Sequence, residues 1–305
     1  MKLLLIRAGA LGDTLMLLPA ILELREAVEI TLVGRSPGLD LLKPYVRQTL
    51  NYDGAGWHRL FMDDPNPGEC PPLPETDRVV AFLHDADGSA SKNLNALLPA
   101  ATVSVCPPFP PKEEKIHLAF YTAQTLARAG CPVDPDRCLE RALAGPLLPK
   151  SRPFRDEQGL VFHPGSGGVR KNHPPLFWEE MIQAVKRALP NRAGNDFVLL
   201  GPAEADLHAY FVTRLKDLEI LVCPEQERLL SILGNAGLYV GHDSGITHLS
   251  AMLGTPTIAL FKESLVHRWR PLGPAVKVIR HTEPGPRLIA RIIEEAKDLG
   301  APWDR

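Results

Sequence analysis

Apolar residues along this chain fall into short, nearly unbroken runs separated by longer segments of mixed polarity. The runs at 2–6, 79–83, 160–162 and 238–240 contain few polar residues, which is typical of parallel strands buried on both faces. Between the runs, segments such as 116–128 repeat apolar residues at helical spacing. Strands that alternate with helices in this way predict an α/β fold with mostly parallel sheets.

The positions of proline and glycine indicate where the chain divides. At 305 residues the chain is long enough for two domains of ordinary size. Segment 142–154 is rich in both residues and has neither a helical nor a strand period, so we expect it to be the linker. The predicted domains are therefore residues 1–150 and 151–305.

The turn at 7–13 follows the first strand and precedes a predicted helix over 14–27. Its two glycines have the spacing G-x-x-G-D and not G-x-G-x-x-G, which argues against a dinucleotide-binding loop. Asp13 lies at the start of the helix, where it could simply cap the helix. A helix N-terminus also favours the ionised form of a carboxylate, so Asp13 is a candidate general base.

A second loop suited to anions follows the strand at 160–162. It is rich in glycine and serine, includes Ser166 and Lys171, and leads into a predicted helix. Lys171 is not a Walker A lysine because G-x-x-x-x-G-K-[ST] is absent. A plain surface lysine is the alternative interpretation.

A third loop of this kind lies between an apolar strand and a helix. Asp243 and Ser244 can cap that helix, and its first turn begins at Gly245 and Ile246, where free N–H groups suit a phosphate. His248, one turn further on, could hydrogen-bond a diphosphate or pack inside the protein. Such a loop lies where open α/β sheets bind ligands, at the carboxyl end of a strand.

Glu204 follows the strand at 197–201 and begins a further predicted helix. A carboxylate can accept hydrogen bonds from two neighbouring hydroxyls of a ligand. An acidic residue is favourable in any first helical turn, so a purely structural role stays open.

Residues 241–251, GHDSGITHLSA, resemble the signature D-[ST]-G-x-x-H-L-x-A of glycosyltransferase family 9. That family contains the ADP-heptose:lipopolysaccharide heptosyltransferases. Segments 7–13, 163–171 and 199–204 agree with the family in the same order, and the agreement extends from residue 1 to about residue 280. The resemblance implies a GT-B-like fold, with two Rossmann-like domains facing one another across a cleft.

The resemblance also implies roles for single residues. Asp13 matches the aspartate that deprotonates the acceptor, Lys171 the lysine at the donor diphosphate, and Glu204 the acidic residue that holds the nucleoside. The sequence departs from the family at His173, where relatives often have tryptophan before the proline. A C-terminal helix over 287–299 would, in such architectures, often pack back on the first domain.

The resemblance therefore implies inverting glycosyl transfer without metal or cofactor. Heptose would pass from ADP-heptose, bound by the second domain, to a lipid-linked glycan of the lipopolysaccharide core, bound by the first. Three alternatives stay open: a sugar-nucleotide epimerase of the same architecture, a dehydrogenase, and a non-catalytic sugar-nucleotide-binding protein. The acidic pair in Asp85-Ala86-Asp87 is a near match to a D-x-D metal motif.

Composition and charge exclude several classes of partner and indicate the compartment in which the protein works. The net charge is −2, and neither half of the chain is a basic platform for nucleic acid. Five cysteines without CxxC spacing argue against a zinc site or a disulfide framework and fit a reducing compartment. No uncharged apolar stretch reaches the roughly 18 residues of a membrane span. We expect a cytoplasmic protein, with peripheral contact at the inner membrane as a further option.

Overall fold

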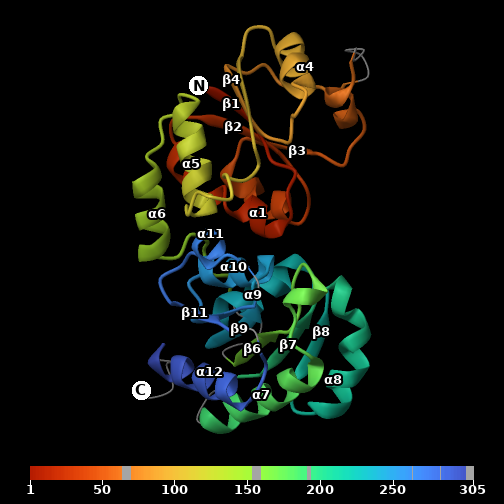
Figure 1. The fold of residues 1–305 in the computed structure, drawn as a ribbon, viewed down its shortest axis with the longest axis vertical. Coiled ribbons are helices and arrows are strands. Elements are labelled where there is room, and N and C mark those ends of the chain that lie inside the picture. Colours follow the sequence, from red (N-terminus) through yellow and green to blue (C-terminus); the bar gives the residue numbers. More distant parts are fainter. Residues whose placement is uncertain (64–69, 153–158, 191–193, 263, 282, 300–305) are drawn as a thin grey trace. The chain divides into compact units, whose positions relative to one another are not determined.

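The structure is a computed structural model, and it describes residues 1–305 apart from 64–69, 153–158, 191–193, 263, 282 and 300–305. Contacts within the chain divide it into two compact units, Met1–Arg141 and Ala142–Arg305. Each unit is built around its own parallel sheet (Figure 1). We describe the two units separately.

The first unit is an α/β domain with the strand order β3-β2-β1-β4-β5, in which every neighbouring pair is parallel. Its elements are, in chain order, β1 (Lys2–Ile6), α1 (Leu11–Leu15), α2 (Leu18–Leu24), β2 (Glu29–Gly34), α3 (Gly38–Leu42), η1 (Lys43–Tyr45), β3 (Gln48–Asn51), η2 (Trp57–Phe61), β4 (Arg78–Phe82), α4 (Ser89–Leu97), β5 (Thr102–Cys106), α5 (Leu118–Arg128) and α6 (Pro135–Ala144).

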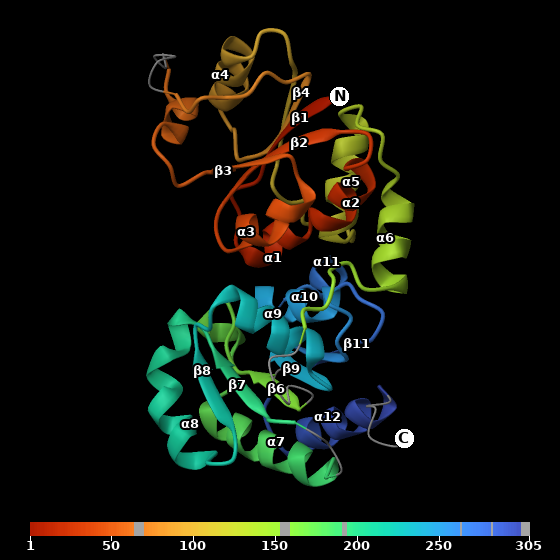
Figure 2. The same ribbon diagram turned by 180° about the vertical axis from the view of Figure 1, so that it is seen from behind.

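Alternating side chains of the central strand β1 face the two layers of helices. Leu4 and Ile6 pack in one buried cluster with Trp57 of η2 and Leu94 of α4. Helices α2 and α5 contact each other, and Figure 2 shows them on the other side of the sheet from α4. Because β1 is covered on both faces, its sequence is apolar almost throughout.

The helix predicted over 14–27 is in fact two helices, α1 and α2, separated by a turn at Met16 and Leu17. Pro19 lies in the first turn of α2, where the missing N–H group leaves no helical hydrogen bond unmade. The short strand β3 and the helix α6 were not predicted, and β3 has no clear apolar period. The strand β3 pairs with only β2, at the edge of the sheet.

The second unit has the strand order β11-β10-β9-β6-β7-β8, again parallel throughout. Its elements are, in chain order, β6 (Leu160–His163), η4 (Val169–Lys171), α7 (Pro175–Ala188), β7 (Phe197–Leu200), η5 (Pro202–Leu207), α8 (His208–Arg214), β8 (Glu219–Val222), α9 (Gln226–Asn235), β9 (Leu238–His242), α10 (Gly245–Met252), β10 (Thr257–Phe261), α11 (Val266–Trp269), β11 (Val276–Arg280) and α12 (Pro286–Asp298).

The C-terminal helix α12 packs inside the second unit. Its buried residues Leu288, Ile292 and Ala296 belong to one core cluster with Trp178 of α7 and Phe211 of α8. Its buried face lies on the sheet of its own unit. The reason is the amphipathic pattern of the helix, whose apolar stripe completes the layer formed by α7 and α8 (Figure 1).

The segment predicted as a linker is also part of the second unit. The N–H groups of Leu147 and Leu148 both donate to the carbonyl of Met252, and the Asn235 side chain donates to the carbonyl of Ser151. These hydrogen bonds attach residues 147–151 to α9 and α10. The division between the units therefore falls earlier in the chain, between Arg141 and Ala142 within α6.

Both sheets have the same plan, which confirms the predicted fold class of two Rossmann-like domains with parallel sheets. Counted within each unit, the first strand lies at the centre, the next two follow on one side, and the later strands follow on the other. The order reverses between β1 and β4 in the first unit and between β6 and β9 in the second. Ligands bind at such reversals, beyond the carboxyl ends of the strands.

Candidate active site

In the first unit, Asp13 lies in the loop that follows the central strand β1. It occupies the first turn of α1 but is not the N-cap residue, which is Ala10. One carboxylate oxygen, Oδ2, accepts a hydrogen bond of 2.9 Å from the N–H group of Ala10. A Cβ atom at Gly9 would lie 2.4 Å from the Cβ of Asp13, so only glycine allows the loop to pass this close.

Asp13 lines a cavity of about 470 Å³ at the carboxyl end of this sheet. The cavity walls combine a carboxylate, two arginines, a histidine and several aromatic rings. The lining residues are Arg7, Ala8, Gly9, Ala10, Asp13, Arg35, Tyr52, Phe61, Phe82, Leu83, His84, Pro108 and Phe109. Aromatic rings beside hydrogen-bonding groups suit a sugar, which has both apolar C–H faces and hydroxyls.

In the second unit, the loop between β9 and α10 is built as predicted around a helix N-terminus. Ser244 is the N-cap residue of α10, and its hydroxyl accepts a hydrogen bond of 3.3 Å from the N–H group of Thr247. Gly245 and Ile246 form the first turn and are partly exposed, so their N–H groups have no partner within the helix. This turn is the part of the site best suited to a phosphate.

Lys171 is paired with an anion of this same loop. Its ammonium nitrogen lies 2.9 Å from Oδ2 of Asp243, whose side chain is only 7% exposed. His248 approaches the other carboxylate oxygen, with Nε2 3.8 Å from Oδ1. The two loops that the sequence suggested as anion sites therefore meet, and three of the predicted residues form one polar cluster.

Ser166 and Glu204 are joined through a residue that the sequence did not suggest, Asn172. The Ser166 hydroxyl donates to Oδ1 of Asn172 over 2.6 Å, and Nδ2 of Asn172 donates to Oε1 of Glu204 over 3.4 Å. A Cβ atom at Gly165 would lie 2.4 Å from Oε2 of Glu204, so the carboxylate lies against a glycine. Glu204 is 6% exposed. The polar side chains of two loops thus lie together at the ends of β6 and β7.

His242 joins the loops after β6 and β9 beneath these groups. Its Nδ1 lies 2.9 Å from the carbonyl of Pro164, and its Nε2 accepts the N–H group of His173 over 3.1 Å. Both contacts are satisfied at once only by a neutral ring protonated on Nδ1. His173 stands where relatives often have tryptophan. The centre of its ring lies 5.1 Å from the ring centre of His242 and 4.8 Å from that of Phe177.

Three histidines at this site are neutral because they are buried. Burial lowers the pKa of His163 and of His173 to about 4 and that of His242 to about 3. The Nδ1 atom of His163 lies 3.3 Å from the hydroxyl of Ser244. These rings therefore serve as hydrogen-bonding and packing groups near neutral pH and add no positive charge to the loops.

A family model described as "Glycosyltransferase family 9 (heptosyltransferase)" matches residues 134–295, which is more than half of the chain. The chain belongs to glycosyltransferase family 9. The match includes both anion loops of the second unit and stops short of the Asp13 loop.

Solved structures of heptosyltransferases have the same fold as this family 9 protein. E. coli heptosyltransferase WaaC, determined with ADP, is 17% identical with a TM-score of 0.69, over 97% of this chain and 100% of that one. E. coli ADP-heptose lps heptosyltransferase II is 19% identical with a TM-score of 0.68, over 98% of each chain. WaaC has also been determined with ADP-2-deoxy-2-fluoro heptose.

A curated relative matches over a shorter region. A Haemophilus influenzae protein, whose own glycosyltransferase assignment is provisional, is 24% identical over 135 residues. This match spans 42% of the present chain and 38% of that relative. None of the helices in the described part of the chain has both the length and the apolar character that a membrane span needs.

The acidic pair considered as a metal motif has a structural role in this family 9 protein. Asp85 accepts hydrogen bonds from the N–H groups of Ala90 and Ser91, at 2.8 and 3.0 Å, and Asp87 accepts from Ser89. Both carboxylates therefore cap α4. Among the described residues, no group of three or more histidines, cysteines or acidic residues is arranged to hold a metal ion.

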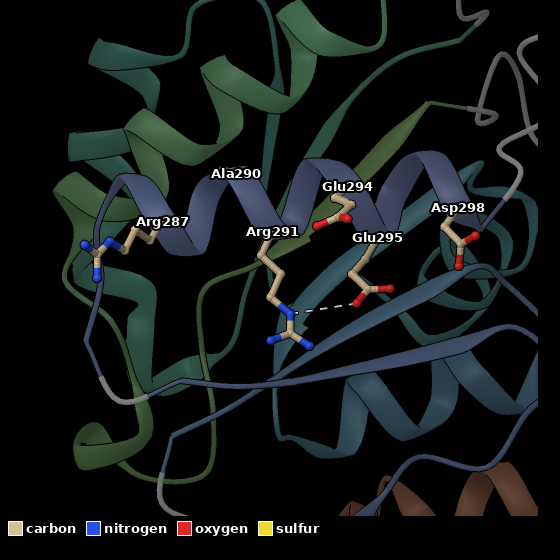
Figure 3. Close-up of a pocket in the computed structure, with 6 residues that line it drawn as sticks. All are labelled: Arg287, Ala290, Arg291, Glu294, Glu295 and Asp298. Carbon is tan, nitrogen blue, oxygen red and sulfur yellow. Dashed lines mark ion pairs between the residues drawn. The ribbon is translucent and has the colours of Figure 1, made fainter.

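A hollow on α12 lies apart from all of these residues. Figure 3 shows that its described lining comes from one face of that helix, namely Arg287, Ala290, Arg291, Glu294, Glu295 and Asp298. Arg291 pairs with Glu295, and Lys277 of β11 pairs with Glu295 and Asp298. These acidic and basic side chains neutralise one another, so the hollow offers no comparable site.

Proposed function

We propose that this protein is an inverting glycosyltransferase that moves heptose from ADP-heptose to a lipid-linked glycan of the lipopolysaccharide core. Family membership supports glycosyl transfer, and the ADP complexes of structural neighbours support an ADP-linked donor. The observation on which the proposal mainly rests is the meeting of the two anion loops, where Lys171 lies 2.9 Å from Asp243.

The second unit, Ala142–Arg305, binds the donor. The diphosphate lies at the N-terminus of α10, where it accepts hydrogen bonds from the N–H groups around Ser244, Gly245 and Ile246. Lys171 and His248 lie beside this place and donate to the phosphate oxygens. Because the Lys171 side chain is 38% exposed, it can turn from Asp243 towards the donor.

The nucleoside lies beside the loops after β6 and β7. Glu204 accepts hydrogen bonds from the two ribose hydroxyls, and Asn172 keeps its carboxylate oriented. Ser166 extends the same hydrogen-bonded row towards the phosphates. Binding at the reversal between β6 and β9 agrees with the general rule for parallel sheets.

The first unit, Met1–Arg141, binds the acceptor in the cavity that contains Asp13. Asp13 takes the proton of an acceptor hydroxyl as that oxygen attacks the anomeric carbon. The new carbon–oxygen bond forms on one face while the bond to the diphosphate breaks on the other, and ADP leaves with the electron pair. The configuration at the anomeric carbon is therefore inverted.

Charge grows on the leaving diphosphate, and the chain supplies its own groups to stabilise that charge. The N–H groups at the start of α10 are oriented before the reaction begins, which is the favourable arrangement for electrostatic catalysis, and Lys171 joins them after turning from Asp243. No cofactor or metal enters the proposed step. The acceptor is membrane-bound, so we propose that the protein works in the cytoplasm with peripheral contact at the inner membrane.

The experiment that tests this function starts with ligand binding. Thermal unfolding is measured with ADP, UDP, GDP, CDP and NAD, each with Mg²⁺ and with EDTA. A ligand at about 100 times its Kd stabilises the fold by about 2.7 kcal/mol. We expect selective stabilisation by ADP in EDTA, whereas stabilisation by NAD alone would contradict the whole proposal and favour a dehydrogenase.

Turnover then separates transfer from the two remaining alternatives. With ADP-heptose and a lipopolysaccharide core acceptor, we expect ADP release that depends on the acceptor and a product of inverted configuration. An epimerase would change the donor without any acceptor. A sugar-nucleotide-binding protein without activity would bind ADP and release nothing.

A further inference from the structure

Arg7, at the end of β1, is a nearly fully buried arginine next to Asp13. Only 1% of its surface is exposed. Guanidinium groups are rarely buried unless they have partners, and Arg7 has several. Its Nε donates to the carbonyl of Asp13 over 3.1 Å, and its Nη1 donates to the carbonyl of Pro108 over 2.8 Å. The guanidinium carbon lies 5.2 Å from the ring centre of Phe82 and 5.6 Å from that of Phe109. Arg7 therefore connects the loop after β1, the end of β4 and the loop after β5.

The third nitrogen of the guanidinium group is directed at the carboxylate of Asp13. Nη2 lies 3.8 Å from Oδ1 and has no hydrogen-bond partner among the described residues. The other oxygen, Oδ2, is already occupied by the N–H group of Ala10. Oδ1 accepts no hydrogen bond from the described residues, so its lone pairs remain available in the cavity wall.

The carboxylate is thus restrained from several sides. Gly9 leaves room for the side chain, Ala10 engages Oδ2, and Arg7 contacts both the main-chain carbonyl and the charge at Oδ1. A catalytic group must be positioned within a fraction of an ångström, and a misplacement of about 1 Å can cost about 100-fold in rate. A rigid, forked side chain fixes the orientation of Asp13 better than a single point charge does.

We propose that Arg7 is a positioning residue that acts through Asp13, and that Oδ1 is the oxygen that receives the acceptor proton. In this step the acceptor O–H bond breaks, the proton passes to Oδ1, and the acceptor oxygen bonds to the anomeric carbon as ADP leaves. The hydrogen bond from Ala10 to Oδ2 and the two main-chain contacts of Arg7 persist throughout. This inference rests on the proposed function, because it assigns geometry to the same base.

A double-mutant cycle tests the coupling between the two residues. The variants are Arg7→Gln, Asp13→Asn and the double variant, and kcat, the KM for donor and acceptor, and the Kd for ADP are measured for each. We expect Arg7→Gln to lower kcat about 10- to 100-fold in the wild-type background but less than about 3-fold beside Asp13→Asn. The Kd for ADP should stay within about 2-fold, because the donor loops belong to the second unit. Arg25→Gln, at an exposed arginine of the same unit, is the matched control with unchanged kcat.

The possible results separate this inference from the proposed function. If the wild-type protein transfers sugar and Arg7→Gln costs the same factor in both backgrounds, Arg7 has only a general structural role and the inference is wrong while the function stands. If the wild-type protein transfers nothing, Asp13 has no proton to accept and both proposals are wrong.

A second variant keeps the inference testable if Arg7→Gln fails to fold, as judged by its melting temperature. Arg7→Lys retains the positive charge but cannot donate to both main-chain carbonyls while a further nitrogen stays near Oδ1. We expect Arg7→Lys to lower kcat about 10-fold, again only where Asp13 is present. Full activity of Arg7→Lys would show that the forked contacts do not orient Asp13, and would overturn the inference.

Discussion

The ammonium group of Lys171 lies 2.9 Å from the carboxylate of Asp243, so the cation expected at the donor diphosphate already has an anionic partner within the protein. The pair connects the loop after β6 with the loop after β9. A phosphate bound here would compete with Asp243 for the ammonium group of Lys171, so its binding depends on both residues.

Removal of Lys171 is therefore expected to harm binding in two ways. In Lys171→Ala, the diphosphate loses a charged hydrogen bond and also meets the carboxylate of Asp243 without its partner. We expect the Kd for ADP to rise about 10- to 100-fold, since a charged hydrogen bond contributes about 1.5–3 kcal/mol. Asp243→Asn in the same chain should restore part of this loss. Isothermal titration calorimetry measures each Kd, with Lys112→Ala in the first unit as the control. Equal Kd values for Lys171→Ala and the wild type would contradict the donor role of the lysine.

Replacement of Asp13 should affect turnover and not donor binding. General-base catalysis contributes about 10²- to 10⁴-fold, so Asp13→Ala is expected to lower kcat by that factor. The Kd for ADP should not change, because the donor loops lie in the other unit. Acceptor-dependent release of ADP is the measurement. Normal turnover of the variant would rule Asp13 out as the base.

A methyl group added at Gly165 should disturb the nucleoside site. The new Cβ would lie 2.4 Å from Oε2 of Glu204, so the carboxylate must move away from Asn172. We expect Gly165→Ala to raise the Kd for ADP about 10-fold, the effect of losing roughly 1.4 kcal/mol. Gly145→Ala is the matched control, because no atom lies within 4 Å of its Cβ position. Unchanged ADP affinity in Gly165→Ala would argue against Glu204 as a ribose ligand.

Because three histidines are buried, we expect the free energy of unfolding to fall in mild acid. His163, His173 and His242 have pKa values lowered by burial from 6.5 to about 4, 4 and 3, so the unfolded chain takes up their protons first as the pH falls. Their contribution is complete above pH 6.5 and is lost progressively below it. Each histidine can add a slope of up to about 1.4 kcal/mol per pH unit. We expect the melting temperature to be level between pH 7 and 8 and to fall between pH 6.5 and 5.

His173→Phe gives this prediction its control. The Nδ1 atom of His173 is buried without a hydrogen-bond partner among the described residues, and the contact with His242 comes from its main chain. An apolar ring should therefore be tolerated. The slope of the unfolding free energy with pH should decrease by the contribution of one histidine. An unchanged slope in His173→Phe would show that this ring does not contribute to the acid sensitivity.

The sequence determined most of the architecture because burial leaves a direct pattern. Strands covered on both faces are apolar throughout, so β1, β4, β6 and β9 could be placed from the apolar runs alone. The edge strand β3 was not predicted. It has a neighbouring strand on one side only, and its partly buried residues are a mixture of polar and apolar types. Pro19 indicated a kink within a single helix and not two helices, since a proline in a first helical turn looks much like a proline that bends a longer helix.

The candidate residues could be named from the sequence because loops that bind anions have their own local chemistry. Asp13, Ser244 and Gly245 each stand at the start of a helix, and a helix N-terminus is visible in the sequence. Their roles in transfer stay predictions, but their places at the carboxyl ends of strands follow from the strand–helix alternation. Glu204 could be placed in the same way.

Only the tertiary structure decided which of these groups touch. Lys171 and Asp243 are far apart in the chain, as are Arg7 and Pro108, and nothing in the local pattern pairs them. The central strands bring such loops together because the carboxyl ends of parallel strands meet at one edge of a sheet. Local sequence specifies each strand and each helix start, whereas contacts between loops depend on strand order, which is settled only when the whole sheet has packed.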